Sequence, residues 1–301
     1  MNLKVAIGKN VFENPVTVAS GTFGYAEKYY DQKAVSKLGA LIPKTITLHA
    51  REGNPPPRIM ETPAGMINAI GIENAGVDAF IKTTLPLLTK IKAPLILSVL
   101  GYSDEEFLAL TKKINTLKGI SALELNLSCP NLKQKSLVAQ DPQATARIVS
   151  RVKQVATFPV IAKLSPNVTD ITEIAMAAVD AGADGLSLVN TFQAMAIDIE
   201  TRRPVLGNVT GGLSGPAIRP AALYMVYRVA QKVKVPIVAM GGIMTARDAL
   251  EFIIAGATMV AVGTANFIDP KAPLAVLRGI KEYMKKQKVD DINQLRQSLA
   301  E

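Results

Sequence analysis

Short runs of β-branched and aliphatic residues recur along the chain, and each run ends in a polar residue or a glycine. Runs of this kind, bounded by turn-forming residues, are typical of buried strands. We predict strands at 15–19, 40–44, 94–99, near 121, at 159–164, 185–189 and 236–240, and near 258.

Helical patterns separate most of these strands, at about 76–91, from 103 onward, and at about 141–156, 169–181, 217–232, after 245 and after 269. Ser103 with Glu106 is a capping-box pair, Asp141 before Pro142 is a typical helix start, and Thr245 is a third N-cap. Alternating strands and helices predict an α/β protein, specifically a closed (β/α)8 or TIM barrel formed by a single domain over 1–301.

Two connections, 48–74 and 191–216, are too long to be simple turns, and the second contains a predicted hairpin around 200–203. Structureless loops longer than about 12–15 residues are uncommon in compact domains and are often lids. Both follow the C-terminal ends of strands. We therefore predict long βα loops and a small hairpin insertion over the C-terminal face, where barrels build active sites.

Composition adds limits on the partners. Hydrophobic residues make up 49% of the chain and aromatic residues 5%, which favours an aliphatic core. The formal charge of +9 comes without an aromatic-interleaved basic patch, a zinc-ligand spacing or a Walker loop, so we expect no nucleic acid. A solvated surface explains the charge, with an anionic ligand or an acidic partner as the alternative. The single cysteine excludes an internal disulfide, and the absence of a signal peptide or a long apolar run predicts a cytoplasmic protein without a membrane segment.

The candidate chemistry lies at or just after the C-terminal ends of the strands, at Ser20-Gly21, Lys44-Thr45, Ser98, Asn126, Lys163, Asn190-Thr191, Gly241-Gly242 and Gly263-Thr264. A lysine at the end of an apolar strand must reach water or face an anion, so Lys44 and Lys163 favour an anionic ligand. The glycines after strands seven and eight lie where barrels commonly bind phosphate through backbone N–H groups. Together they predict a phosphate-bearing cofactor or substrate.

Cys129 lies in the polar turn that follows the fourth strand. An unpaired cysteine is most often a small buried apolar residue, and that interpretation stays open. A cysteine nucleophile would need a histidine base, and the sole histidine, His49, better fits a surface role. A cysteine acting alone, whose thiolate is tuned by a positive neighbour and by burial, can instead take a proton from carbon.

A set of motifs extends over nearly the whole chain. These are Ala19-Ser20-Gly21-Thr22-Phe23-Gly24, Lys44-Thr45-Ile46-Thr47-Leu48, Arg51-Glu52-Gly53-Asn54-Pro55, Asn68-Ala69-Ile70-Gly71-Ile72, Asn126-Leu127-Ser128-Cys129-Pro130-Asn131, Lys163-Leu164-Ser165-Pro166-Asn167, Gly211-Gly212-Leu213-Ser214-Gly215-Pro216 and Gly241-Gly242-Ile243. With these motifs in this order, the chain resembles the class 1 dihydroorotate dehydrogenases, and most closely the NAD-linked class 1B catalytic subunits. The class 2 serine at the cysteine position and the class 2 membrane-associating extension are both absent from this sequence.

The resemblance implies FMN in the barrel mouth, without a metal. The implied cofactor contacts are Ser20, Lys44, Thr45, Ser98, Asn126, Lys163, Val189, Gly215, Gly241, Gly242, Gly263 and Thr264. The implied substrate contacts are Lys44, Asn68, Ala69, Ile70, Gly71, Ile72, Asn126, Asn190 and Thr191, with Asn131 as a weaker candidate. Cys129 matches the family's catalytic base. Ser98 stands where class 1B proteins commonly carry asparagine, and its shorter side chain favours a water-mediated contact with the flavin.

The implied reaction oxidises (S)-dihydroorotate to orotate in de novo pyrimidine (UMP) biosynthesis, with hydride passing to FMN. Because the chain has no Rossmann fingerprint and one cysteine cannot hold an iron–sulfur cluster, the resemblance implies a separate iron–sulfur flavoprotein subunit. That subunit would carry FAD and a [2Fe–2S] centre and reduce NAD, in a heterotetramer built on a catalytic homodimer. The alternatives are a stand-alone fumarate-dependent class 1A-like enzyme, a related pyrimidine-reducing flavoprotein domain and a non-redox phosphate-binding barrel.

Overall fold

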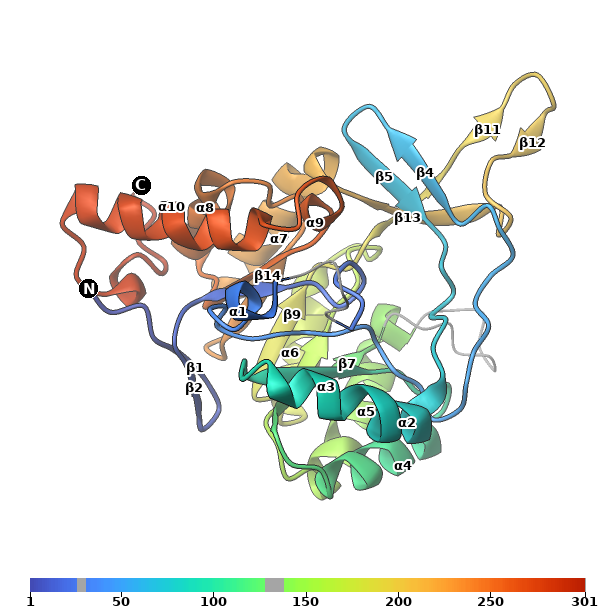
Figure 1. The fold of residues 1–301 in the computed structure, drawn as a ribbon, viewed down its shortest axis with the longest axis horizontal. Helices are drawn as coiled ribbons and strands as arrows, with labels where there is room; N and C mark the ends of the chain where they lie inside the picture. The colour runs from blue at the N-terminus through green and yellow to red at the C-terminus, as the bar shows by residue number, and fades with distance from the viewer. Residues whose placement is uncertain (26–30, 128–137, 301) are drawn as a thin grey trace.

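A sheet of seven parallel strands is the centre of the computed structural model, which describes residues 1–25, 31–127 and 138–300 (Figure 1). Its strands lie in the order β3 (Val16–Val18), β15 (Met259–Val262), β14 (Ile237–Met240), β9 (Gly185–Leu188), β8 (Val160–Lys163), β7 (Ile120–Asn126) and β6 (Leu95–Val99). Their residues are almost all buried, as expected for strands covered on both faces.

The segment 39–46 lies between β3 and β6, the two outer strands of this sheet, and closes the barrel. Leu41 and Ile46 form isolated parallel bridges with β6, and the backbone N–H of Gly39 donates to β3 at 2.9 Å. The prediction of a regular strand at 40–44 is therefore wrong. Pro43 has no N–H to donate, so the ladder cannot continue through it. The α/β-barrel fold class is confirmed.

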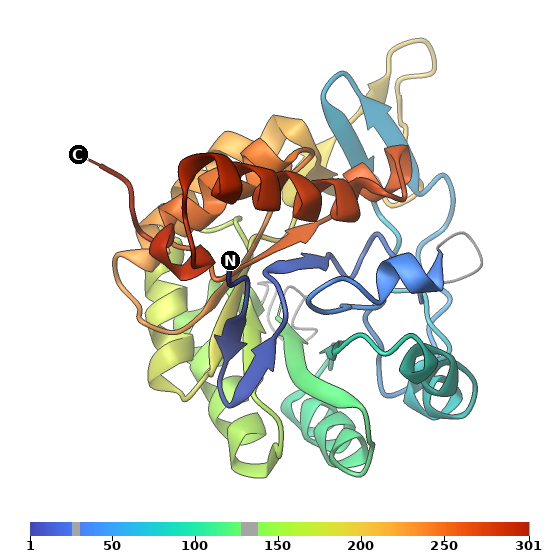
Figure 2. The same cartoon turned by 60° about the vertical axis from the view of Figure 1, so that its left-hand side comes forward.

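Helices surround the strands on the outside (Figures 1 and 2). The α-helices are α1 (Gln32–Val35), α2 (Gly76–Ala79), α3 (Leu85–Lys90), α4 (Asp104–Asn115), α5 (Pro142–Val155), α6 (Ile171–Asp180), α7 (Arg219–Ala230), α8 (Ala246–Ala255), α9 (Ala265–Ile268) and α10 (Ala272–Gln287). The π-helix η1 (Phe80–Thr84) joins α2 to α3, and η2 (Val138–Gln140), η3 (Pro216–Ile218) and η4 (Ile292–Gln294) are short 3-10 turns. Within the described ranges, none of these helices combines the length and the apolar character needed to span a bilayer.

The predicted helix starts are confirmed by their caps. The Ser103 hydroxyl accepts from the N–H of Glu106 at 3.2 Å, and Asp141 caps α5. Thr245 and Asp248 form a complete capping box at the start of α8. Local side-chain chemistry thus sets where these helices begin.

Asp170 caps α6 and gives a pH-dependent contribution to stability. The backbone N–H and the hydroxyl of Thr172 donate to its carboxylate and hold the pKa of that carboxyl below its usual range. Because the folded-state pKa is depressed, the stabilisation is present at neutral pH and is lost as pH falls through that pKa, below about 4. We expect Asp170→Asn, which keeps a capping side chain without its charge, to lower the free energy of unfolding at pH 7. Urea titrations should show this difference narrowing below about pH 4, and a difference independent of pH would contradict the prediction.

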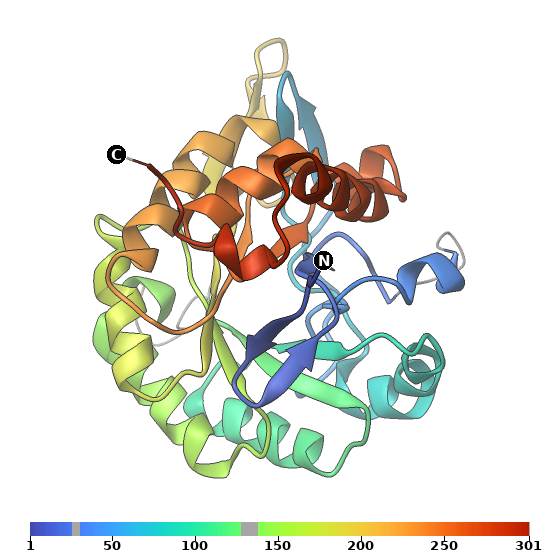
Figure 3. The ribbon, with the colours of Figure 1, turned by 90° about the vertical axis from the view of Figure 1, so that its left-hand side faces the viewer.

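A hairpin at the N-terminus covers the opposite end of the barrel from the strand C-termini (Figure 3). Strands β1 (Val5–Ile7) and β2 (Asn10–Phe12) pair antiparallel. The Asn10 side-chain amide donates to the carbonyl of Ser121, at the start of β7, and the side chain of Ile7 packs against Gly185, at the start of β9. This end of the barrel is therefore closed, and its other end is available for a ligand.

A second sheet projects beyond the barrel, at the upper right of Figure 1. Its antiparallel strands lie in the order β10 (Phe192–Met195), β13 (Thr210–Ser214), β5 (Gly65–Asn68) and β4 (Ile59–Thr62). Strands β11 (Ile197–Asp198) and β12 (Arg203–Pro204) form the predicted hairpin beyond it. The two long connections are therefore not structureless loops, because 66–68 pairs with 212–214.

Candidate functional site

Four buried polar side chains meet inside the barrel near the C-terminal ends of its strands. Lys163 ends β8 and is 5% exposed, and its Nζ donates to Ser20 Oγ at 3.3 Å. The same Nζ lies 3.8 Å from Oε1 of Glu124 on β7. The other oxygen of that carboxylate accepts from Ser187 Oγ at 2.7 Å. Ser20 and Lys163, two separately predicted cofactor residues, are thus brought together, with a carboxylate beside them.

Thr45 and Ser98 form a second buried contact at the same end of the barrel, where their hydroxyl oxygens lie 2.9 Å apart. Both side chains come from predicted cofactor positions. Lys44 is partly exposed, and in the described part of the chain no side-chain hydrogen bond or ion pair joins it to the other candidates. Its ammonium is therefore held less firmly than that of Lys163.

Glycines that follow β13 and β14 form a side-chain-free surface, which we call the glycine cradle and define as Gly215, Gly241 and Gly242. Their φ angles are +97°, +129° and +75°, a region that residues with a Cβ rarely adopt. A Cβ on Gly242 would lie 2.7 Å from the carbonyl oxygen of Gly215, so the two backbones approach closely. A cradle of this kind lets backbone N–H groups reach an anion.

Other predicted cofactor residues border this cradle. Val189 Cγ2 lies 3.5 Å from the position that a Cβ on Gly241 would take, and Thr264 Cγ2 lies at the same distance from that of Gly215. The hydroxyl of Thr264 donates to Ser214 at 2.9 Å. Gly263 lies next to Ala19, directly before Ser20, so the cradle and the lysine pair belong to one end of the barrel.

The predicted substrate residues divide into groups. Asn68 Nδ2 donates to the carbonyl of Gly212 at 3.3 Å, and Thr191 lies against the same glycine. Asn190 accepts from the backbone N–H of Thr191 at 2.8 Å. Asn126 ends β7 and is in register with Lys163. Asn68 and Thr191 therefore meet at the second sheet, while Asn126 lies in the barrel.

The segment that follows Asn68 packs against its own connection. The carbonyl of Ile70 accepts from the N–H of Asn54 at 3.0 Å, and Gly71 lies against the same asparagine. Gly71 and Ile72 both have positive φ, and Ala69 is buried. This turn holds the end of β5 in a fixed shape.

Cys129 and Asn131 lie outside the described residues. Strand β7 ends at Asn126, three positions before the cysteine. His49 is exposed, in agreement with its predicted surface role.

Sequence reasoning missed Glu124 and Asn167. Glu124 could have been found from the sequence, because it is an acidic residue inside an otherwise apolar strand. It lies two positions from Asn126 and hence on the same face of the strand. Asn167 donates to the carbonyl of Thr191 at 3.1 Å and accepts from the N–H of Gln193 at 2.8 Å. It therefore fixes the entry to the second sheet.

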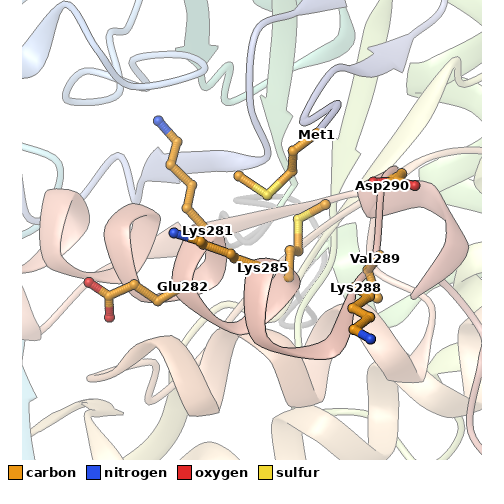
Figure 4. A pocket seen from close by; sticks show the side chains of 8 residues that line it. Met1, Lys281, Glu282, Lys285, Lys288, Val289 and Asp290 are labelled. Atoms are coloured by element: carbon orange, nitrogen blue, oxygen red, sulfur yellow. The ribbon is translucent and has the colours of Figure 1, made fainter.

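A separate groove of about 490 Å³ lies between Met1 and the C-terminal part of α10 (Figure 4). Lys281, Lys285 and Asp290 line it beside buried Met284. None of the predicted site residues lines this groove, so it is distinct from the candidate site.

Comparison with known proteins gives the family. A family model for dihydroorotate dehydrogenase matches residues 2–284. The chain belongs to the dihydroorotate dehydrogenase family. Similar proteins include the catalytic subunit of dihydroorotate dehydrogenase B (NAD(+)) from Desulforudis audaxviator, which is 53% identical over 97% of this chain and 95% of its own length. The subunits of the same name from Geotalea uraniireducens and Caldicellulosiruptor bescii are each 50% identical, over 98% of this chain and 97% and 98% of their own lengths.

The dihydroorotate dehydrogenase family is FMN-dependent, and two features of this barrel fit that cofactor. The glycine cradle has no room for side chains at Gly242, which suits close approach of a phosphate to the backbone. Lys163 offers a buried ammonium whose hydrogen bond, among the described residues, goes to Ser20 alone. An ammonium has three donors, so it can also bind an electron-rich ring atom.

Proposed function

We propose that this chain is the catalytic subunit of an NAD-linked dihydroorotate dehydrogenase, which oxidises (S)-dihydroorotate to orotate in de novo pyrimidine biosynthesis. The observation that carries the proposal is the buried Lys163, which lies at the same end of a dihydroorotate dehydrogenase barrel as the glycine cradle. The names of the similar catalytic subunits, which match almost end to end, support the same reaction and acceptor. The chain would act as a single domain over 1–301.

The cofactor would be bound by residues from both halves of the barrel. The cradle, with Gly263 and Thr264, would hold the phosphate. The ring and ribityl chain would be contacted by Ser20, Lys44, Thr45, Ser98, Asn126, Lys163 and Val189. When bound, FMN supplies the acceptor for the hydride that leaves C6 of the substrate. The hydroxyl of Ser98 already contacts Thr45, which favours a water-mediated contact with the flavin.

The substrate would be oriented by side chains at the edge of the mouth. Lys44 would bind the carboxylate, and Asn68, Asn126, Asn190 and Thr191 would bind the polar ring atoms together with the backbone of 68–72. Cys129 would take the proton from C5 as a thiolate. Holding the reacting groups in this arrangement supplies much of the rate enhancement, because it removes the entropy cost of orientation.

Electrons would leave through a second subunit. The chain contains one cysteine and no Rossmann fingerprint, so it cannot itself hold an iron–sulfur cluster, and the NAD site would lie elsewhere. We propose an iron–sulfur flavoprotein partner that carries FAD and a [2Fe–2S] centre, in a heterotetramer built on a catalytic homodimer. The assembly would be cytoplasmic, without a metal in this chain.

One anaerobic experiment tests the proposal. We expect the purified chain to be yellow and dihydroorotate to bleach its flavin absorbance in a single turnover. NAD added to the bleached chain should restore the colour at full rate only after the partner subunit is added.

Other outcomes would select the alternatives. Rapid recovery with fumarate and no partner would favour a stand-alone class 1A-like enzyme. Bleaching of the flavin absorbance by dihydrouracil, but not by dihydroorotate, would favour a pyrimidine-reducing flavoprotein. A colourless chain that takes up no FMN would favour a phosphate-binding barrel without redox chemistry.

A further inference from the structure

Glu124 is a buried carboxylate beneath the site, and the proposed reaction assigns it no role. Its side chain is 1% exposed to solvent. Ser187 donates to Oε2, but Oε1 has no hydrogen-bond partner among the described residues. Its nearest cation is the ammonium of Lys163, at 3.8 Å, which is beyond hydrogen-bond length.

Burying such a carboxylate is costly unless a counter-charge compensates it. The register of the sheet explains how the contact forms. Glu124 lies two residues before Asn126 on β7, on the same face of the strand, and Asn126 is beside Lys163 on β8. Lys163 is in turn beside Ser187 on β9. The carboxylate therefore extends beneath the lysine, with one oxygen held by Ser187 and the other directed at the ammonium.

Lys163 is thus held from two sides. Ser20 accepts its hydrogen bond at the end of β3, and Glu124 lies on the side of the barrel interior. The pair has no net charge. An ammonium compensated in this way attracts added negative charge less strongly than a lone ammonium does, because the carboxylate repels the same charge.

We propose that Glu124 is a positioning residue for Lys163, and that its carboxylate limits the positive charge that Lys163 presents to bound FMN. The inference rests on the proposed function, because Lys163 faces the cofactor only if FMN binds at this end of the barrel. Two-electron reduction places negative charge on the flavin. The compensated lysine stabilises that charge weakly and keeps the reduction potential low, which suits a cofactor that must pass electrons towards NAD.

The test is the reduction potential of bound FMN in Glu124→Gln, measured by anaerobic equilibration with a reference dye. Glutamine keeps the size of the side chain and its hydrogen bond with Ser187 but removes the charge. We expect the equilibrium between oxidised and reduced FMN to shift by about tenfold towards the reduced form. For a two-electron couple this is a rise of about 30 mV.

Two further variants separate charge from packing. Ser187→Ala removes the hydrogen bond to Glu124 and keeps both charges. Its equilibrium ratio of oxidised to reduced FMN should therefore stay within about threefold of the wild-type ratio. Glu124→Asp keeps the carboxylate but shortens the side chain. Like Glu124→Gln, it should shift the equilibrium towards reduced FMN, by at least about threefold. If Glu124→Gln does not fold, Glu124→Asp is the deciding variant.

A shift below about threefold in the deciding variant, or a shift towards oxidised FMN, would overturn the inference. So would an equal shift in Ser187→Ala. These measurements need no substrate, so they are independent of dihydroorotate oxidation. If FMN in Glu124→Gln keeps the wild-type reduction potential and is still bleached by dihydroorotate, this inference is wrong and the proposed function stands. A wild-type chain that binds no FMN would instead overturn the proposed function, and this inference with it.

Discussion

Replacing Cys129 by alanine is expected to leave FMN bound while slowing flavin reduction by dihydroorotate about 10²- to 10⁴-fold, the range for a lost acid–base group. No other residue in the segment 128–131 offers an acidic group, because the neighbours of Cys129 carry a hydroxyl, a proline ring and an amide. Stopped-flow absorbance under anaerobic conditions measures the step directly. The yellow colour of the resting variant serves as the check on cofactor binding.

Two matched variants separate the thiol from general damage. Cys129→Ser keeps the size of the side chain but offers a weaker acid, so its rate should fall between those of the wild type and the alanine variant at neutral pH and rise as pH increases. His49→Ala removes the only histidine, which is exposed, and should leave the rate unchanged. Unchanged flavin reduction in Cys129→Ala would end the assignment of Cys129 as the base.

The barrel could be predicted from the sequence because its strands are buried on both faces and appear as continuous aliphatic runs between capped helices. The pattern failed at 40–44, where the apolar run contains Pro43 and the backbone forms only isolated bridges. It also failed for the second sheet. The pairing of Asn68 with Gly212 joins segments 144 residues apart, and local periodicity contains no information on such a contact.

The candidate site was predictable to the extent that it follows strand ends. Lys163 and Ser20 were found this way, because parallel strands bring their C-terminal ends to one edge. Glu124 was missed because its importance depends on a neighbour in another strand. The side chain of Lys163 is 39 positions away in the sequence but 3.8 Å away in the fold. Only the register between β7 and β8 reveals that contact.

Replacing Gly242 by alanine is expected to weaken FMN binding by about 100-fold while the barrel stays folded. The φ of +75° is unfavourable for alanine, and the new Cβ would meet the carbonyl of Gly215 and the Cβ of Arg219, each at 2.7 Å. Arg219 cannot readily move away, because it begins α7 and its guanidinium is paired with the buried carboxylate of Asp248. The new Cβ also displaces the two backbones where the phosphate must approach, and a loss of about 2.7 kcal/mol in binding free energy corresponds to about 100-fold in affinity.

The matched control is Gly182→Ala, at the turn that precedes β9. Its φ of +96° imposes a similar backbone strain, but its nearest neighbour is the flexible side chain of Lys153 at 3.6 Å, away from the strand C-termini. Both variants should therefore lose stability in urea, while only Gly242→Ala should lose affinity in a fluorescence titration of the apoprotein with FMN. Because strain is common to both glycines, equal FMN affinities in the two variants would show that the cradle does not hold the phosphate. A selective loss at Gly242 would mean that the close approach of the two backbones, rather than loop flexibility, is what the cofactor requires.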